Sequence, residues 1–203
     1  MIKETFLTLI STYSSDENYN LDCWLEIEKN YTSKSRHYHN LDHLENMLTE
    51  LEAVKSEIKN LDTLVFAIFY HDIVYKATKS DNEHQSALLF QKRITKTSFT
   101  HIRECMFQIE ATKKHELSAC HDTNFLLDVD LSILGKSKDV YTAYCKNIRK
   151  EYKIYPDIMY RPGRKKVLES LLALKSIYKT KFFIEKYEPQ ARENLRLELQ
   201  QLN

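Results

Sequence analysis

Histidine and aspartate side chains, which bind divalent metal ions in many proteins, occur in four short stretches of the sequence. His71 and Asp72 directly follow a run of seven apolar residues, residues 64–70. Burying a charged aspartate beside a histidine is costly unless a cation compensates the charge. The pair therefore indicates a metal site at the end of a buried helix. The four stretches are residues 38–43, 71–72, 112–115 and 127–131.

Each stretch also has a purely structural interpretation. His39 alone fits a helix cap or a packed surface histidine. His71 fits a helix C-terminus, where an imidazolium interacts favourably with the helix dipole. Asp128 and Asp130 fit an N-cap and a first-turn acid of the helix that follows. We favour a shared metal site, because the structural interpretation needs three unrelated coincidences, each beside apolar sequence.

The composition favours an all-α protein. The 203 residues include only 2 glycines and 3 prolines, where average usage gives about two dozen. Tight hairpins and phosphate-binding loops consume glycine, so a β-sandwich, a Rossmann fold and a P-loop enzyme are all disfavoured. We expect one compact helical domain over residues 1–203, with a metal-site core at about 36–135 and helices at about 137–202 that complete the bundle.

Apolar spacing and capping residues predict the helices that position the metal ligands. Asn40 is a candidate N-cap, and a continuous helix through His39 and His43 places both side chains on one face. Asp62 is a candidate cap of the helix over residues 64–70, which we expect to be buried on all sides. Turn signals occur at residues 113–115, Gly135, Pro156 and residues 161–163. The apolar residues at 6–10 predict a first short helix that ends near residues 14–16, and the spacing of Trp24, Ile27 and Tyr31 predicts a second. Further helices are expected at residues 81–94, 99–112, 123–134, 137–154, 163–178 and 189–202.

Charge and cysteine content restrict the partners and the compartment. The 30 lysines and arginines balance 29 acidic residues to a net charge of +1, which gives no strong signal for nucleic acid and none for a membrane. No apolar run reaches the ~18 residues of a membrane span, and the first residues are not typical of a secretory signal. The 4 widely spaced cysteines favour reduced thiols in a cytoplasmic protein. The leucine stripe of the last predicted helix is expected to close the core, with a homodimer contact as the alternative.

The order of these residues, H…HD…D, resembles the signature of the HD-domain metal-dependent phosphohydrolases, and the match is closest to a branch of predicted HD phosphohydrolases of similar length. The resemblance extends from residue 24 to the C-terminus, so it covers nearly the whole chain. The shared motifs are R-x-Y-H-N-x-x-H at 36–43, Y-H-D-I-V-Y at 70–75, D-N-E-x-x-S-A at 81–87, A-T-x-x-H at 111–115, L-D-V-D-L-x-I-L-G at 127–135, Y-R-x-G-R at 160–164 and A-R-x-N-L at 191–195.

The resemblance implies an all-helical fold of the HD-domain, phosphodiesterase-like type and roles for individual residues. His39 is similar to the histidine that protonates the leaving oxygen in cyclic-nucleotide phosphodiesterases. His115 resembles an additional histidine that some HD proteins use for a second metal or for the substrate. Asp128 is the alternative to Asp130, because the second aspartate of D-x-D is the usual ligand in this superfamily. The implied metal ligands are His43, His71, Asp72 and Asp130.

A phosphate substrate also needs cations. Arg36, Arg161 and Arg164 are candidates, because an arginine can bind phosphate through two parallel hydrogen bonds. Glu83 is a candidate for proton transfer or for orienting His71, with a capping box in its own helix as the alternative.

These features predict a hydrolase that cleaves a phosphomonoester or a phosphodiester, with a nucleotide as the expected substrate and a metal-activated water as the nucleophile. The ligand set fits one or two ions of Mn, Fe, Co, Ni or Zn, and Mg fits least well. Residues 73–76 lack the Gly-Lys or glutamate that several HD phosphohydrolases carry after the HD pair. This departure motivates one alternative, a module that binds or senses a nucleotide without turnover. A di-iron oxygenase is the other alternative.

Overall fold

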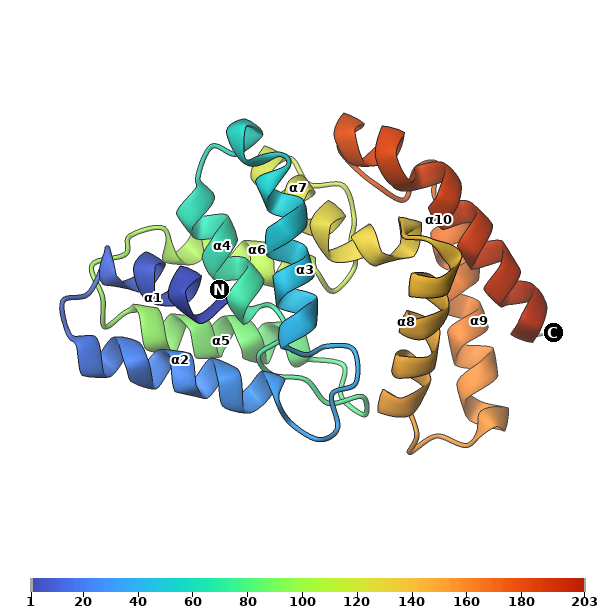
Figure 1. Cartoon of the computed structure of the whole chain (residues 1–203), viewed down its shortest axis with the longest axis horizontal. Coiled ribbons are helices and arrows are strands. Elements are labelled where there is room, and N and C mark those ends of the chain that lie inside the picture. Colours follow the sequence, from blue (N-terminus) through green and yellow to red (C-terminus); the bar gives the residue numbers. More distant parts are fainter. Residues whose placement is uncertain (1, 203) are drawn as a thin grey trace. The chain divides into compact units, whose positions relative to one another are not determined.

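The computed structural model of the chain describes residues 2–202, and every regular element in this range is helical. The expectation of an all-α protein is therefore confirmed. The chain divides into two compact units, residues 1–126 and residues 127–203, and the boundary lies inside helix α7. Figure 1 shows the elements in chain order by colour. The two units are described separately below, and the expectation of a single domain stays a prediction.

The first unit is built around its most apolar helix. Helix α4 (Leu61–Tyr70) contacts α1, α3, α5 and α6, and Figure 1 shows it among these helices. All residues from 63 to 70 are buried, as expected for a helix that is apolar on every side. The other elements of this unit are α1 (Ile2–Ser11), α2 (Glu17–Tyr31), α3 (Leu41–Glu52), the 3-10 helix η1 (Lys55–Glu57), α5 (Asn82–Ile94), α6 (Ile102–Ala111) and the first part of α7 (His121–Asp130).

Aromatic side chains fill the space around α4. The ring of Phe66 lies edge-on to Phe6 and Phe99, with centroid distances of 6.4 and 4.9 Å. One turn further on, the ring of Tyr70 lies 5.3 Å from that of Phe90. Edge-to-face pairs of this kind add to the stabilisation that area burial gives. The last turn of α4 is therefore held in a closely packed core, and so is the segment that directly follows it.

Two capping predictions have different outcomes. Asn40 caps α3 as predicted, because its side-chain oxygen accepts backbone N–H groups of the first turn, including that of His43. The prediction that Asp62 caps α4 is wrong, because the side chain of Asn60 accepts the free N–H group at that helix start. Asp62 instead accepts a hydrogen bond of 2.6 Å from the hydroxyl of Tyr13.

The second unit packs a short helix closely against the last long one. A β-carbon at Gly135 would lie 2.5 Å from Cβ of Tyr187, so only glycine fits at this position. The side-chain amide of Asn194 donates to the backbone carbonyls of Leu134 and Lys136, at 2.8 and 2.9 Å. The elements of this unit are the end of α7, the 3-10 helix η2 (Leu131–Gly135), α8 (Lys138–Glu151), α9 (Asp157–Ala173) and α10 (Lys181–Leu202).

Two helices contain a proline at which the sequence predicts a turn or a helix start. Helix α9 begins at Asp157 and continues through Pro162, where a turn was expected. Helix α10 begins at Lys181 and contains Pro189, which was expected to start it. A proline inside a helix removes one backbone hydrogen bond. In α10, buried residues lie both before and after the proline, so burial of a continuous face outweighs that loss. In α9, Pro162 is the sixth residue, so about one turn of helix precedes it and the buried residues follow it.

Candidate metal centre

Three of the predicted metal ligands lie together in the first unit. His43 is in the first turn of α3, and His71 and Asp72 directly follow the last residue of α4. Among the residues that the structure describes, these three form the one group of at least three potential ligands whose donor atoms all lie within 4.8 Å of one another. Both histidines are buried, at 3% and 1% exposure, and Asp72 is half-buried. We call these three residues the His–Asp cluster.

The distances within the His–Asp cluster match those between ligands of one metal ion. Nε2 of His43 lies 3.2 Å from Nε2 of His71, and Oδ2 of Asp72 lies 3.2 Å from the same His71 nitrogen. Nitrogen and oxygen ligands lie about 2.0–2.2 Å from a first-row divalent ion, so two ligands at tetrahedral or octahedral angles are about 3.0–3.5 Å apart. These two separations fit a single ion, and the third, between His43 and Asp72, is within 4.8 Å.

The hydrogen bonding of His71 decides which of its nitrogens is available to a metal. Nδ1 lies 2.8 Å from the backbone carbonyl of Ile68, which can only accept, so Nδ1 carries a proton. In the neutral ring, Nε2 then presents a lone pair towards His43 and Asp72. Lone pairs gathered in a buried place are favourable only with a proton or a cation among them. A backbone carbonyl on the far nitrogen is also the usual arrangement for a metal-binding histidine.

His39 lies beside the His–Asp cluster, although the predicted continuous helix through it is wrong. Helix α3 begins only at Leu41, because Asn40 is its N-cap and the residues before Asn40 are not helical. Nε2 of His39 nevertheless lies 3.9 Å from Oδ2 of Asp72. Its half-buried ring lies against Tyr75, with a centroid distance of 4.3 Å and an interplanar angle of 30°. The imidazole is thus held at the edge of the cluster, within reach of a molecule bound there.

Arg36 is buried, at 8% exposure, and its guanidinium binds the protein's own backbone. Nη1 donates to the carbonyls of His39 and Asp72, at 3.0 and 2.6 Å, and Nη2 donates to the carbonyl of Ile73 at 2.8 Å. The guanidinium also lies over the ring of Tyr31, 4.7 Å from its centroid. Arg36 therefore ties the segment before α3 to the segment after α4. Sequence reasoning missed this role, since carbonyl partners leave no pattern in the sequence, and a phosphate contact of Arg36 stays a prediction.

Two side chains of α5 hold the segment that leaves the site. Oγ of Ser86 accepts the backbone N–H of Val74 at 3.1 Å and donates to its carbonyl at 3.3 Å. The side-chain amide of Asn82 accepts the N–H of Lys76 at 3.1 Å and donates to its carbonyl at 3.0 Å. These side chains satisfy backbone groups that no helix or strand satisfies. The motif D-N-E-x-x-S-A thus has a structural use that sequence reasoning did not assign.

Glu83 and His115 lie outside the His–Asp cluster as defined by its donor distances. Glu83 is the half-buried second residue of α5. His115 lies in the connection after α6 with φ of 51°, a left-handed conformation that is uncommon for a residue with a β-carbon. Strained positions of this kind concentrate at functional sites. The proton-transfer role of Glu83 and the substrate role of His115 stay predictions.

Asp130, the predicted fourth ligand, is the half-buried last residue of α7 and belongs to the second unit; its role stays a prediction. Its alternative, Asp128, is fully buried. The Asp128 carboxylate accepts hydrogen bonds of 2.7 Å from the backbone N–H groups of Lys179 and Thr180 and from the hydroxyl of Thr180. Burial raises the pKa of Asp128 to about 6, although these hydrogen bonds oppose the shift. The carboxylate thus anchors the segment before α10.

The two candidate phosphate-binding arginines of the second unit differ in environment. Arg161 is exposed on α9, whereas Arg164 is buried and donates through Nε and Nη2 to the two carboxylate oxygens of Glu198, at 2.7 and 2.9 Å. Burial disfavours the charged carboxylate, but the hydrogen bonds and charge of Arg164 outweigh it and lower the pKa of Glu198. Phosphate contacts of both arginines stay predictions, and Arg164 would have to exchange its carboxylate partner for a phosphate.

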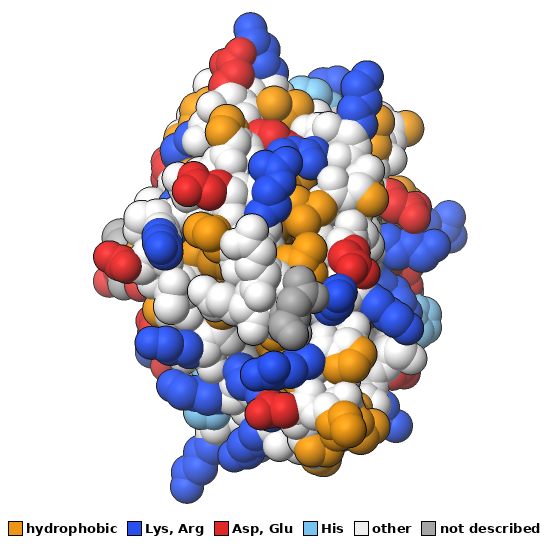
Figure 2. Space-filling model, turned by 90° about the vertical axis from the view of Figure 1, so that its right-hand side faces the viewer, with side chains coloured by type: hydrophobic (Ala, Val, Ile, Leu, Met, Phe, Trp, Pro, Cys, Tyr) orange, Lys and Arg blue, Asp and Glu red, His pale blue; other side chains and the backbone are white. Residues whose placement is uncertain are grey.

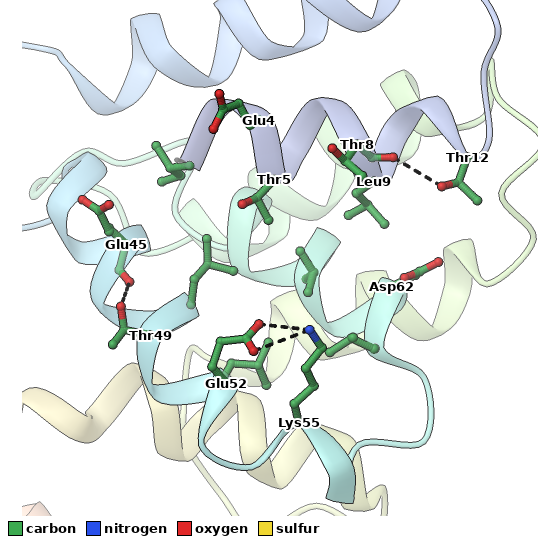
Figure 3. A pocket seen from close by; sticks show the side chains of 15 residues that line it. Glu4, Thr5, Thr8, Leu9, Thr12, Glu45, Thr49, Glu52, Lys55 and Asp62 are labelled. Atoms are coloured by element: carbon green, nitrogen blue, oxygen red, sulfur yellow. Dashed lines mark hydrogen bonds and ion pairs between the residues drawn. The ribbon is translucent and has the colours of Figure 1, made fainter.

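A groove of about 630 Å³ lies elsewhere in the first unit, between α1, α3 and α4 (Figure 3). Figure 3 shows Thr5 and Thr8 of α1 on one side and the ion pair of Glu52 and Lys55, 3.1 Å apart, on another. None of the predicted site residues is among the described residues that line it. The groove is therefore distinct from the candidate metal centre.

Comparisons of the chain with protein-family models, with curated proteins and with solved structures found no match. Among the described residues, each helix is either too short or too polar to cross a membrane. The candidate function therefore rests on the His–Asp cluster and its surroundings.

Proposed function

We propose that the His–Asp cluster binds a divalent transition-metal ion and that the protein is a metal-dependent phosphohydrolase of the HD-domain type. The observation that carries the proposal is the pair of 3.2 Å separations that meet at Nε2 of His71. Two imidazoles and one carboxylate leave coordination positions for water and for a phosphate oxygen. The proposed substrate is a phosphomonoester or phosphodiester of a nucleotide, and the proposed location is the cytoplasm.

The residues around the cluster have distinct tasks in this proposal. A bound divalent ion lowers the pKa of a water molecule towards neutrality and offsets charge on the phosphoryl oxygens. A backbone carbonyl keeps the proton on Nδ1 of His71, so that Nε2 faces the ion. His39, held against Tyr75, carries a proton at Nε2 for the leaving oxygen. Arg36 keeps His39 and Asp72 at a fixed separation through their carbonyl groups.

A redox function at a di-iron site is the third candidate, because two imidazoles with one carboxylate also bind iron in many non-haem oxygenases. A nucleotide-sensing module without turnover is the second candidate and ranks above it. It is motivated by residues 73–76, whose backbone is bound by α5 and which supply no acidic side chain. All three candidates require the metal site, so they differ in the reaction and not in the ligands.

Metal content tests the first half of the proposal. The protein is purified without added metal as the wild type and as the variants His71→Gln and Asp72→Ala. A matched control is His84→Gln, which alters an exposed histidine bonded to Glu110. Elemental analysis should find about one ion per chain in the wild type and the control and almost none in the two cluster variants. Equal metal content in all four proteins would overturn the proposal.

Turnover tests the second half. The metal-loaded protein is incubated with Mn²⁺, Co²⁺ or Ni²⁺ and a panel of phosphomonoesters, phosphodiesters and nucleotides, and released product is measured. His39→Gln should retain the metal and lose about 10²–10⁴-fold in rate, as expected for removal of a general acid. Turnover with Mn²⁺ under nitrogen would exclude the redox function. A nucleotide that binds tightly and forms no product would instead support the sensing module.

The fourth ligand has its own comparison. Asp130→Asn and Asp128→Asn lie two residues apart in α7 and alter carboxylates with different surroundings. If Asp130 binds the metal, only Asp130→Asn lowers the metal affinity, because the Asp128 carboxylate is already occupied by three donors. A loss of affinity in Asp128→Asn alone would reverse the assignment.

A further inference from the structure

The connection between α8 and α9 exposes large aliphatic side chains. Ile154 lies in this connection, and Ile158 and Met159 lie in the first turn of α9, with exposed fractions of 67%, 82% and 60%. Figure 2 shows hydrophobic side chains gathered at the lower end of one face, the end at which Figure 1 places this connection. Single exposed apolar residues are ordinary, but a group of them marks an interaction surface. We call these three residues the aliphatic tip.

The aliphatic tip is not the product of a loose loop. The guanidinium of Arg149 donates to the carbonyls of Tyr152 and Tyr155, at 3.1 and 3.0 Å, and to Oδ1 of Asp157 at 2.7 Å. The same guanidinium lies 4.6 Å from the centroid of the Tyr160 ring. These contacts fix the connection at both ends. The connection therefore has one defined conformation, in which the aliphatic side chains point into solvent. The protein forgoes the stabilisation that burying these side chains would give.

The helices on either side of the tip are strongly basic. Residues 146–166 contain eight lysines or arginines and two acidic residues, a net charge of +6 in a chain whose total is +1. Of the two acidic side chains, Glu151 is buried at 7% exposure, and the exposed Asp157 is paired with Arg149 at 2.7 Å. The exposed cations of this stretch are Lys146, Lys150, Lys153, Arg161 and Lys166.

We propose that the aliphatic tip and these cations form a peripheral membrane-binding surface. The aliphatic side chains enter the headgroup region of an anionic phospholipid bilayer, and the lysines and arginines contact the lipid phosphates. Binding of this kind needs no helix that crosses the membrane. The inference departs from the expectation of no membrane partner, which rested on the net charge of the whole chain. It is independent of the proposed metal site.

The chemistry of the tip favours a lipid surface over other partners. The side chain of Ile158 is 82% exposed, so few protein atoms surround it. Such a side chain can insert among lipid headgroups, which rearrange around it. Three aliphatic side chains provide much less than the ~800 Å² per partner that a stable protein dimer buries. Proteins that bind single-stranded nucleic acid place aromatic rings against the bases. The tyrosines at 152, 155 and 160 are half-buried and lie against one another, and the most exposed side chains of the connection are aliphatic.

Vesicle binding of the full-length protein tests the proposal. The protein is sedimented with vesicles of phosphatidylcholine, with and without phosphatidylserine, at low and high salt. We expect binding only to the phosphatidylserine vesicles, and we expect salt to weaken it, because surface charges are screened. The double variant Ile154→Ser, Ile158→Ser and the double variant Lys150→Glu, Lys153→Glu should each bind about tenfold or more weakly.

Matched controls alter equally exposed residues of the other unit. Leu117→Ser removes an aliphatic side chain that is 75% exposed, and Lys114→Glu reverses an exposed lysine. Both controls should bind vesicles like the wild type, and circular dichroism should show all variants to be helical. No binding to phosphatidylserine vesicles, or binding that the tip variants leave unchanged, would overturn the proposal. So would an RNA oligonucleotide or a second copy of the chain that binds the wild type and is lost in the same variants.

Discussion

The His–Asp cluster of the first unit and the Arg164–Glu198 pair of the second are both buried sets of ionisable groups, yet they are built differently. In the pair, a guanidinium and a carboxylate meet through two hydrogen bonds and neutralise each other. In the cluster, two imidazoles and a carboxylate bring ligand atoms within 4.8 Å of one another. The pair consists of opposite charges, whereas the cluster consists of the ligand types that we propose for a divalent cation. What a buried group faces, and not its burial, indicates whether a ligand belongs there.

Asp128 is an intermediate case between these two regions. Its buried carboxylate accepts three hydrogen bonds, but none of those donors carries a charge. The pKa of Asp128 is accordingly raised to about 6 by burial, whereas the charged partner Arg164 lowers the pKa of Glu198. Neutral donors thus compensate a buried carboxylate only in part.

Arg164→Met breaks the complete pair and should have the largest effect. The carboxylate of Glu198 would remain buried without a counter-charge, so we expect the free energy of unfolding to fall by about 3–5 kcal/mol. Urea unfolding measures the loss. Adding Glu198→Leu should recover most of it, because no charge is then buried. An unchanged unfolding curve for Arg164→Met would show that the pair contributes nothing to stability.

Asp72→Asn should respond in the opposite way. Without metal, the variant should be at least as stable as the wild type. The substitution removes the negative charge of Asp72 from a site where its oxygen lies close to two histidine nitrogens that can also act as acceptors. With Mn²⁺ at about one hundred times its dissociation constant, the wild type should gain about 2.7 kcal/mol and the variant nothing. Urea unfolding with and without Mn²⁺ measures both quantities. A metal-free variant that is much less stable than the wild type would make the cluster a structural feature like the pair.

Asp128→Asn should change how the free energy of unfolding depends on pH. The folded-state pKa of about 6 lies above the ordinary aspartate value of 3.8, so the protonated form is favoured in the folded protein. Its contribution to stability is complete below the unfolded pKa and is lost as the pH rises through about 6. Between pH 4 and pH 7 the wild type should lose about 2 kcal/mol that Asp128→Asn does not lose. Identical pH profiles of unfolding for the two proteins would contradict this.

Arg36→Lys should have the smallest of these effects and act on the cluster alone. A lysine cannot reach three carbonyl groups with the geometry of a guanidinium, so the two segments that carry the ligands would be held less firmly. We expect the metal affinity to fall about tenfold, measured by competition with a coloured chelator. Arg103→Lys, an exposed arginine on α6, is the control. Lower stability with unchanged metal affinity would restrict Arg36 to a role in folding.

The sequence was sufficient for features that depend on neighbouring residues. The burial of α4 followed from its unbroken apolar run, and the cap at Asn40 followed from residue type and position. The same local reasoning placed a turn at Pro162 and a helix start at Pro189. Both predictions were wrong. In α10, burial on both sides of the proline outweighs the loss of one hydrogen bond, and in α9 the helix begins about one turn before its proline.

Partners that lie far apart in the chain were not predictable in the same way. The basic residues around Arg164 in the sequence predicted a phosphate contact, but its partner in the structure is Glu198, 34 residues away. The guanidinium of Arg36 meets carbonyls 36 and 37 residues further along the chain. Residue type and spacing could indicate His71 and Asp72 as a pair, since they are adjacent and follow an apolar run. Spacing alone could not show which side chain holds them in place.

The side chains of Ser86 and Asn82 protect two backbone amides next to the candidate metal centre, those of Val74 and Lys76. These amides belong to no helix, so their hydrogen–deuterium exchange reports the moments when residues 73–76 separate from α5. Exchange faster than that of the α4 amides would identify a local fluctuation, and equal rates would identify global unfolding. The exchange rate of the Val74 amide, which is bonded to the Ser86 hydroxyl, therefore measures how often the segment beside the candidate metal centre opens.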